Sequence, residues 1–374
     1  TPKPSSAASD VYKRQSLVPL NHGANSNVKF GAQASGVDLA CLSDTDFQDI
    51  ETALYEHLLI VFKDQGHLTP EQQFEFTRRF DPDSDAYGLS DDVLHSEKSI
   101  LRKDLKAVPR VPQVQVIGHG WLDDYEGLKN VELIHPTHHT FHRDPLPSDE
   151  RKYTRFNRWH MDAALYGLQP PIVTTLQAVV VPEGKQIVRY DDGSGEELEV
   201  PTCATAFVSG ETMYNRLSPE EKLFADQCYV EYAPHPFMWM SRCRSRSTGL
   251  GLYSEGRELQ EHELPPIEKE KIQILPMVWR NPMTGRRALQ VHPSAVKKLH
   301  VHGEVIEDLE RIREILYQLQ RPAISPSYVY AHPWEPGDLI VFYDRGLLHT
   351  VTGVVDALRV MRQCSLGGST SVIN

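Results

Sequence analysis

Cysteine is scarce in this sequence, and its five copies do not fall into pairs. Cys41, Cys203, Cys228, Cys243 and Cys364 are scattered along the chain, and no Cys-x-x-Cys spacing occurs. An odd number of scattered cysteines argues against a disulfide framework and against a zinc ribbon. We therefore expect a reducing compartment, with the cytoplasm as the predicted location.

Several hallmarks of other protein classes are also missing. No apolar run approaches the ~20 residues that span a bilayer, so we expect no membrane partner. Basic residues are in deficit, with a net charge of −12 at pH 7, and we expect no nucleic-acid partner because such surfaces need a basic patch. There is neither a glycine-rich phosphate loop nor a Gly-x-Ser-x-Gly nucleophile elbow. The sequence leaves open whether the protein is a homo-oligomer.

The chain divides into a short foreign-looking start and one long domain. Residues 1–15 differ in character from the rest of the chain and lack the pattern of a signal peptide; we interpret them as a non-native segment. The 40% hydrophobic content is typical of a folded globular protein. We predict that residues 16–374 form a single domain.

Short apolar strands outnumber helices in the remaining sequence. Helical spacing or capping signals predict helices over residues 44–57 and 305–319 and helix starts near residues 69 and 218. Strands are expected at residues 58–62, 112–118, 172–181, 338–342 and 359–365, with hairpins at 187–200 and 277–292. Without β-α-β alternation, this pattern favours a mostly β fold with peripheral helices, an antiparallel sandwich or jelly roll. Residues 190–335 would be a large insertion into that core.

Two distant segments carry the residues that predict a chemistry. His160 and Asp162 stand two positions apart, and His349 lies far downstream, ten residues before Arg359. Residues i and i+2 of a strand point to the same face, so His160 and Asp162 can hold one ion. Two histidines and a carboxylate form the facial triad of non-heme Fe(II), which leaves coordination positions open. We predict His160, Asp162 and His349 as metal ligands and Arg359 as the partner of a carboxylate co-substrate.

Other interpretations of these residues remain open. A second His-x-Asp pair, His142 and Asp144, lies in a polar loop, where the same-face argument fails. Each histidine could instead be an ordinary core or loop residue. The triad also suits a catalytic zinc ion with a bound water, although a zinc hydrolase gives Arg359 no role. A third functional class that fits these residues is a non-catalytic binding protein with the same fold.

The order of these motifs resembles the taurine dioxygenase-like (TauD/TfdA) family of Fe(II)/2-oxoglutarate-dependent dioxygenases. The similarity lies in residues 59–73, in residues 159–162 with the prolines at 170 and 171, and in residues 359–363. It covers most of residues 25–368 apart from the central insertion. The resemblance implies a double-stranded β-helix (jelly-roll) core. It also implies Fe(II), 2-oxoglutarate and O2 as cofactors and co-substrates, a small polar substrate, and release of succinate and CO2.

Within that family, four segments are similar to the fungal α-ketoglutarate-dependent xanthine dioxygenases. These segments are residues 163–167, 189–193, 245–251 and 289–293. The resemblance implies hydroxylation of xanthine to urate. The chain departs from these dioxygenases at Ile134, where a lysine is expected, and at Ser365, where an asparagine is expected. Near Gln186 the family often has a threonine that contacts 2-oxoglutarate, so Gln186 is a candidate co-substrate contact. The same subgroup implies an alternative substrate, a small amino acid such as valine.

The last predicted strand places further candidates beside the metal. Arg359, Gln363 and Ser365 share one face of a strand. Gln363 is therefore a candidate substrate contact that could bind a purine edge, or else it satisfies a buried backbone group. Gln115, on the half-buried strand at residues 112–118, and Ser365 are weaker candidates for substrate binding.

Overall fold

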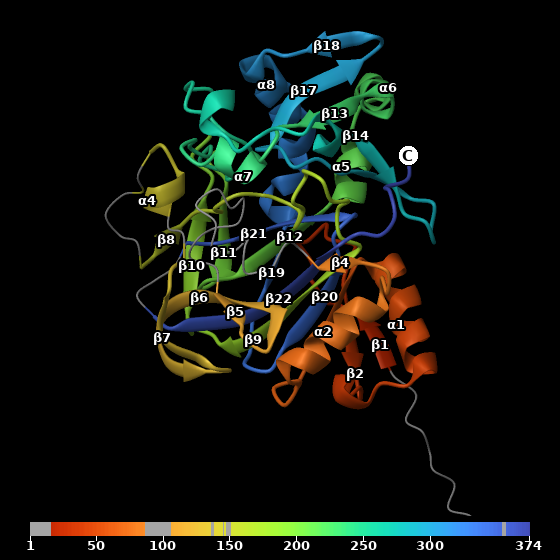
Figure 1. Ribbon diagram of the computed structural model, residues 1–374, viewed down its shortest axis with the longest axis vertical. Coiled ribbons are helices and arrows are strands. Elements are labelled where there is room, and N and C mark those ends of the chain that lie inside the picture. Colours follow the sequence, from red (N-terminus) through yellow and green to blue (C-terminus); the bar gives the residue numbers. More distant parts are fainter. Residues whose placement is uncertain (1–15, 87–105, 136–137, 145, 147–150, 354–356) are drawn as a thin grey trace, which may run out of the picture.

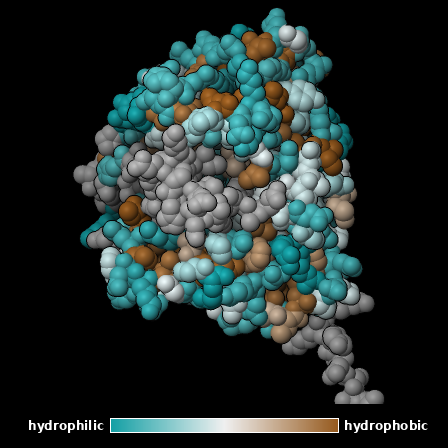
Figure 2. Space-filling model, in the orientation of Figure 1, coloured by the Kyte–Doolittle hydropathy of each residue, from teal (hydrophilic) through white to brown (hydrophobic). Residues whose placement is uncertain are grey.

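The computed structural model describes residues 16–86, 106–135, 138–144, 146, 151–353 and 357–374. Most regular structure in these ranges is β, and helices lie around it, as predicted (Figure 1). Hydrophilic residues predominate on the face that Figure 2 shows, where hydrophobic residues form small separate groups.

A large sheet forms one wall of the molecule. Its strands follow the order β1 (Ser16–Pro19), β2 (Ala32–Ser35), β3 (Leu59–Phe62), β20 (Leu339–Tyr343), β9 (Val173–Val180), β22 (Arg359–Gly367), β6 (Val111–Tyr125) and β5 (Lys106–Val108). Two more strands extend it, β4 (Asp85–Ala86) on β22 and β7 (Leu128–Leu133) on β6. The predicted strands of residues 58–62, 112–118, 172–181, 338–342 and 359–365 all belong to this sheet.

A smaller sheet faces the large one. It consists of β19 (Tyr330–His332), β12 (Thr205–Ser209) and β21 (Leu347–Val351), and β12 places Phe207 directly opposite His349 of β21. Phe207 packs against Phe342 of the large sheet with ring centroids 5.2 Å apart, so aromatic side chains fill the space between the sheets. A third sheet comprises β11 (Glu197–Pro201), β10 (Lys185–Arg189) and β8 (Tyr153–Thr154).

Two capped helices pack against the N-terminal part of the large sheet (Figure 1, orange). Helix α1 (Asp44–His57) begins at Ser43, whose hydroxyl accepts the Asp46 N–H. Helix α2 (Pro70–Arg79) begins with the predicted capping box of Thr69 and Gln72. Both helix starts are therefore confirmed. Phe76 of α2 is buried against the sheet, whereas Phe74 is half-buried.

Residues 210–325, the part of the predicted insertion between β12 and β19, build a second layer at one end of the molecule (top of Figure 1). A four-stranded sheet has the order β14 (Ile274–Pro276), β13 (Tyr229–Tyr232), β17 (Val296–Val301) and β18 (Glu304–Ile306). The predicted hairpin is β15 (Val278–Arg280) with β16 (Arg287–Leu289). The helices here are α5 (Gly210–Arg216), α6 (Pro219–Gln227), α7 (Pro236–Trp239) and α8 (Leu309–Gln320), and α4 (His138–Phe141) precedes β8. Since β12 and β19 fall within residues 190–335, that range also supplies strands of the small sheet.

Two local expectations need correction. The helix predicted over residues 305–319 begins only at Leu309, because Glu304–Ile306 pairs with β17 and Asp308 caps the helix. The segment around His160 is extended but is not a regular strand. It is held by isolated bridges, one between Phe156 and Thr352 and one between His160 and His349.

Candidate active site

His160 and His349 come together because their backbones pair. The His160 N–H donates to the His349 carbonyl at 2.9 Å, and the His349 N–H donates back to the His160 carbonyl at 2.8 Å. On its other side, His349 is held by β12. Two residues beyond His160 the chain bends, and the Asp162 N–H donates to the Asp344 carboxylate at 3.0 Å. These backbone contacts fix all three predicted ligands relative to one another.

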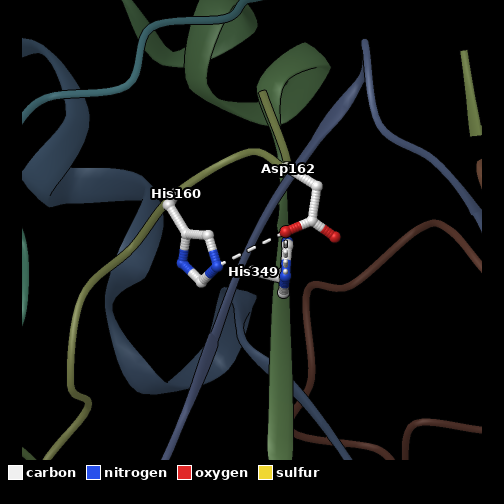
Figure 3. A group of neighbouring side chains, drawn as sticks. All are labelled: His160, Asp162 and His349. Carbon is white, nitrogen blue, oxygen red and sulfur yellow. Dashed lines mark ion pairs between the residues drawn. The ribbon is translucent and has the colours of Figure 1, made fainter. Parts of the chain in front are cut away.

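The three side chains converge on one point (Figure 3). The nearest Asp162 oxygen lies 3.7 Å from His160 Nε2 and 3.6 Å from His349 Nε2, and the imidazole centroids are 4.2 Å apart. These separations are too long for hydrogen bonds. Metal–ligand bonds of about 2.0–2.2 Å let two ligand atoms on one ion lie up to about 4.2 Å apart. The geometry therefore suits a shared metal ion.

The Nε2 atoms of both imidazoles face the Asp162 carboxylate. The His160 Nδ1–H donates to the Arg158 carbonyl at 2.8 Å, which leaves the Nε2 lone pair directed at the other ligands. Burial lowers the pKa of His349 well below its usual value, and the neighbouring His160 and His292 lower it further. Because metal ions bind neutral imidazole, His349 needs to release no proton at neutral pH.

The carboxylate of Asp162 is oriented by the neighbouring strands. Gln363 Nε2 on β22 donates to Asp162 Oδ2 at 2.7 Å. Burial raises the pKa of Asp162, while His160, Thr174 and Gln363 act in the opposite direction. The hydroxyl of Ser365, two residues beyond Gln363, is hydrogen-bonded to the Thr174 hydroxyl at 3.1 Å. Gln363 and Ser365 thus lie beside the candidate metal, where they support Asp162.

Three other residues considered in the sequence analysis, Gln115, Gln186 and His142, lie on other parts of the fold. Gln115 of β6 stands directly opposite Gln363 and is half-buried, so it shares the inner face of the large sheet. Gln186 is buried on β10, opposite Val200 of β11. The Nε2–H of His142 donates to the Phe156 carbonyl at 2.9 Å. Within the described residues, the group of His, Cys, Asp or Glu side chains that fits a metal is His160, Asp162 and His349.

Arg359 is buried at the start of β22 without a charged partner. It is 2% exposed, and no hydrogen bond or ion pair joins its guanidinium to another described residue. Burial lowers its pKa, with Cys203 as the neighbour that opposes the effect. The register with β6 puts Arg359 on the same face as Gln363. A carboxylate is the kind of group that would neutralise a buried guanidinium without a charged partner.

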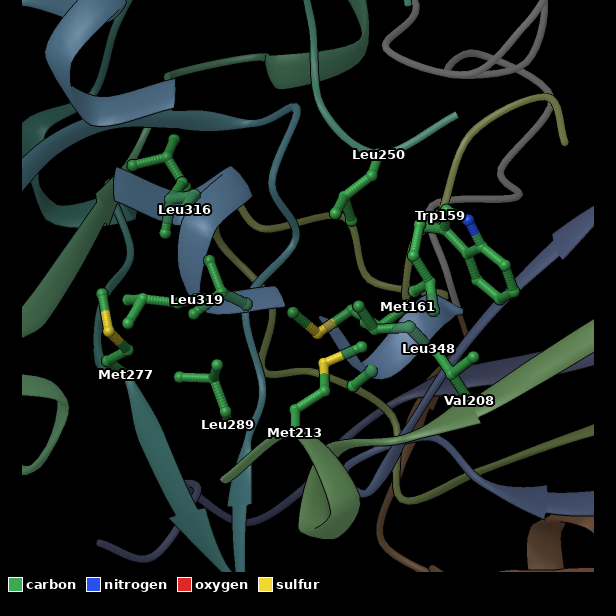
Figure 4. Packing of buried hydrophobic residues seen from close by; sticks show 14 of the residues in the cluster. Trp159, Met161, Val208, Met213, Leu250, Met277, Leu289, Leu316, Leu319 and Leu348 are labelled. Atoms are coloured by element: carbon green, nitrogen blue, oxygen red, sulfur yellow. The ribbon is translucent and has the colours of Figure 1, made fainter. Parts of the chain in front are cut away.

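The second layer of the fold holds the segment that carries His160. The Trp159 N–H donates to the Gly249 carbonyl at 3.0 Å, and the indole N–H donates to the Thr248 carbonyl at 3.2 Å. Arg158 donates to the Cys243 carbonyl at 2.8 Å. Trp159 and Met161 belong to one buried cluster with residues of the second layer (Figure 4). The insertion therefore forms part of the scaffold of the site.

Three functional neighbours were not predicted from the sequence. Gln290 donates to the Asp344 and Leu347 carbonyls at 2.8 and 2.7 Å and so anchors the turn before His349. Asp344 holds the backbone of Asp162. His292, two residues after Gln290, has its ring centroid 6.2 Å from that of His160. Both Gln290 and His292 lie in a segment that resembles the family, but no residue signal placed that segment at the metal.

Comparison with known proteins identifies the family. The model of the taurine catabolism dioxygenase TauD, TfdA family matches residues 19–365. The chain belongs to this family. It is 58% identical over 360 residues to an α-ketoglutarate-dependent xanthine dioxygenase of Emericella nidulans, in an alignment that covers 95% of this chain and 97% of the relative. An α-ketoglutarate-dependent xanthine dioxygenase of Neurospora crassa is 54% identical over 364 residues, 94% of this chain and 87% of the relative.

Solved structures agree with this assignment. A crystal structure of a taurine dioxygenase from Burkholderia xenovorans superposes with a TM-score of 0.58 at 18% identity, covering 96% of this chain and 95% of that one. The predicted jelly-roll fold of a TauD/TfdA family member is thereby confirmed. In the described part of this family member, helices fall short of the length and apolarity that a membrane crossing requires.

Proposed function

We propose that this protein is an Fe(II)- and 2-oxoglutarate-dependent dioxygenase that hydroxylates xanthine to urate. The convergence of His160, Asp162 and His349, with an Asp162 oxygen 3.7 and 3.6 Å from the two Nε2 atoms, is the observation that carries the proposal. The 58% identity to an α-ketoglutarate-dependent xanthine dioxygenase supports the choice of substrate.

The donor set fits Fe(II). Two neutral imidazoles and one carboxylate leave positions open on the ion, as in non-heme iron oxygenases. When bound, Fe(II), 2-oxoglutarate and O2 supply the oxidation: one oxygen atom enters the substrate hydroxyl and the other enters succinate, while CO2 leaves. The protein residues hold and orient these groups. Gln363 and Thr174 fix Asp162, and the Arg158 carbonyl fixes the tautomer of His160.

Arg359 is the proposed partner of the distal carboxylate of 2-oxoglutarate. Its guanidinium is buried without a carboxylate partner among the described residues, which is costly for a charged group unless a ligand neutralises it. Between Arg359 and Gln363 on the same face lies Met361, which packs with Leu176 and Ala178. This apolar surface suits the methylene groups of a dicarboxylate that reaches from the metal to Arg359. Gln186 remains a proposed second contact of the co-substrate.

The cysteines support a reducing compartment, for which we propose the cytoplasm. The structure contains no disulfide among Cys41, Cys203, Cys228, Cys243 and Cys364. The proposed partners are small molecules, the substrate and 2-oxoglutarate.

Succinate formation with purified protein tests the activity. Protein supplied with Fe(II), 2-oxoglutarate and O2 should release succinate in step with urate when xanthine is added. Valine tests the amino-acid alternative, and Zn²⁺ in place of Fe(II) under anaerobic conditions tests the hydrolase alternative. His160→Ala and His349→Ala should abolish both turnover and tight Fe(II) binding. Variants that bind iron as tightly as the parent, together with no turnover of any substrate, would refute the proposal.

A further inference from the structure

The second layer of the fold brings a third histidine, His292, close to the candidate metal centre. His292 follows β16, and its ring centroid lies 6.2 Å from that of His160. On another side, Phe237 of α7 meets the His292 ring edge-on, with centroids 6.4 Å apart. His292 is 1% exposed. An imidazole is thus enclosed between the candidate metal site and the insertion.

The ring of His292 makes no hydrogen bond to another described residue, in contrast to the rings of three other buried histidines. His142, His235 and His332 each have a ring nitrogen in a hydrogen bond to a backbone carbonyl or a side chain. Neither ring nitrogen of His292 is bonded to another described residue, and Nδ1 is fully buried. Its backbone N–H, by contrast, is satisfied by the Tyr232 hydroxyl at 3.4 Å. A buried polar group without a partner costs stability, so we expect a bound ligand to form a hydrogen bond with this imidazole.

The His292 ring can bind both a hydrogen-bond acceptor and a hydrogen-bond donor, because a neutral imidazole presents one N–H and one nitrogen lone pair. That pair matches the alternating N–H and C=O groups on the edge of an oxidised purine.

His292 does not belong to the metal-ligand set. The cluster whose ligand atoms converge contains His160, Asp162 and His349 without it. Nor does it lie toward the proposed co-substrate site, since Arg359 and Gln363 approach from β22, on the side of Asp162. His292 approaches from the insertion, on the side of His160.

We propose that His292 is a substrate-binding residue that hydrogen-bonds the polar edge of the purine and sets its orientation toward the metal. This inference rests on the proposed function. It assigns the insertion a direct part in substrate recognition, in addition to its support of the His160 segment.

Anaerobic spectroscopy separates this role from metal binding. Fe(II) and 2-oxoglutarate give a weak visible charge-transfer band in the parent protein, and xanthine should shift it. In His292→Leu the band should form with unchanged Fe(II) and 2-oxoglutarate affinity, while the xanthine concentration for half-maximal shift rises at least about tenfold, as for loss of one buried hydrogen bond. His292→Gln keeps a donor and an acceptor and should recover part of the affinity. In turnover assays, the KM for xanthine should be lowest in the parent, intermediate in His292→Gln and highest in His292→Leu.

Tyr232→Phe is the matched control, because it removes a contact of the His292 backbone and leaves the ring. It should respond to xanthine like the parent, within about twofold. Equal xanthine responses in the parent and His292→Leu would overturn the inference alone. Loss of the band itself in His292→Leu would also overturn it, since the residue would then support the metal. A parent that binds Fe(II) and 2-oxoglutarate but ignores xanthine would instead refute the proposed substrate.

Discussion

Replacing Gln363 with leucine should weaken metal binding. The Gln363 amide donates to the Asp162 carboxylate at 2.7 Å inside the protein. A hydrogen bond to a charged group contributes about 1.5–3 kcal/mol, which corresponds to roughly a 10- to 150-fold change in an equilibrium constant. Losing a residue that orients a metal ligand typically costs about 10- to 100-fold in metal affinity. Thr174 still supports Asp162 in the variant, so we expect the lower part of this range, about tenfold to thirtyfold.

Anaerobic calorimetric titration with Fe(II) measures this loss directly. Gln115→Leu is the matched control, because Gln115 stands opposite Gln363 on the neighbouring strand and has no contact with Asp162. Its metal affinity should equal that of the parent. The argument fails if Gln363→Leu binds Fe(II) as tightly as the parent while its KM for xanthine rises. Gln363 would then be a substrate contact, which is the role the sequence first suggested for it.

Three further variants test other parts of the structure. Arg359→Gln should weaken 2-oxoglutarate binding by roughly 30-fold or more while Fe(II) affinity is kept, as judged by the charge-transfer titration; unchanged co-substrate affinity would remove Arg359 from the site. Gly249 has φ +72°, and an added Cβ would lie 2.5 Å from a backbone oxygen, whereas Gly256, at φ +65°, faces open space. Urea unfolding should therefore show Gly249→Ala to be less stable than Gly256→Ala by at least about 1 kcal/mol. Burial alone would raise the pKa of Asp192, but hydrogen bonds led by that from Arg321 hold it well below its usual value. Its stabilising effect is thus complete above about pH 4 and is lost as the pH falls toward the folded pKa, so Asp192→Asn should lose less stability than the parent between neutral pH and pH 3.

The convergence of the three candidate ligands was predictable because the signal was local and ordered. A His-x-Asp pair, a distant histidine and an arginine ten residues later are readable without knowing the fold. The strand argument behind the pair was less accurate: His160 is held by one bridge to His349, and Asp162 sits at a bend. Alternation along β22 correctly placed Gln363 on the face of Arg359. It could not reveal that the Gln363 amide donates a hydrogen bond to Asp162, because that contact joins residues about 200 positions apart.

Contacts made by the insertion could not be predicted in the same way. Nothing in the spacing of Gln290 or His292 points to a metal, since their positions depend on how residues 210–325 fold back over the jelly roll. The four-residue shift in the start of α8 has a similar cause. Glu304–Ile306 fits an amphipathic helix by periodicity, but pairing with β17 satisfies more of its backbone groups. In each case a tertiary contact decided between structures that the local sequence allows.

The insertion and the metal centre depend on each other energetically. Trp159 and Met161, on either side of His160, are buried in the same cluster as Leu316 of α8, so the segment that carries a candidate ligand is also core for the insertion. The Gly249 carbonyl and the Gln290 amide then tie the insertion to the backbones beside His160 and before His349. Removing the insertion would expose this apolar surface and leave those backbone groups unpaired. The jelly roll alone thus supplies the three ligands of the site, but the second layer is needed to hold two of them in register.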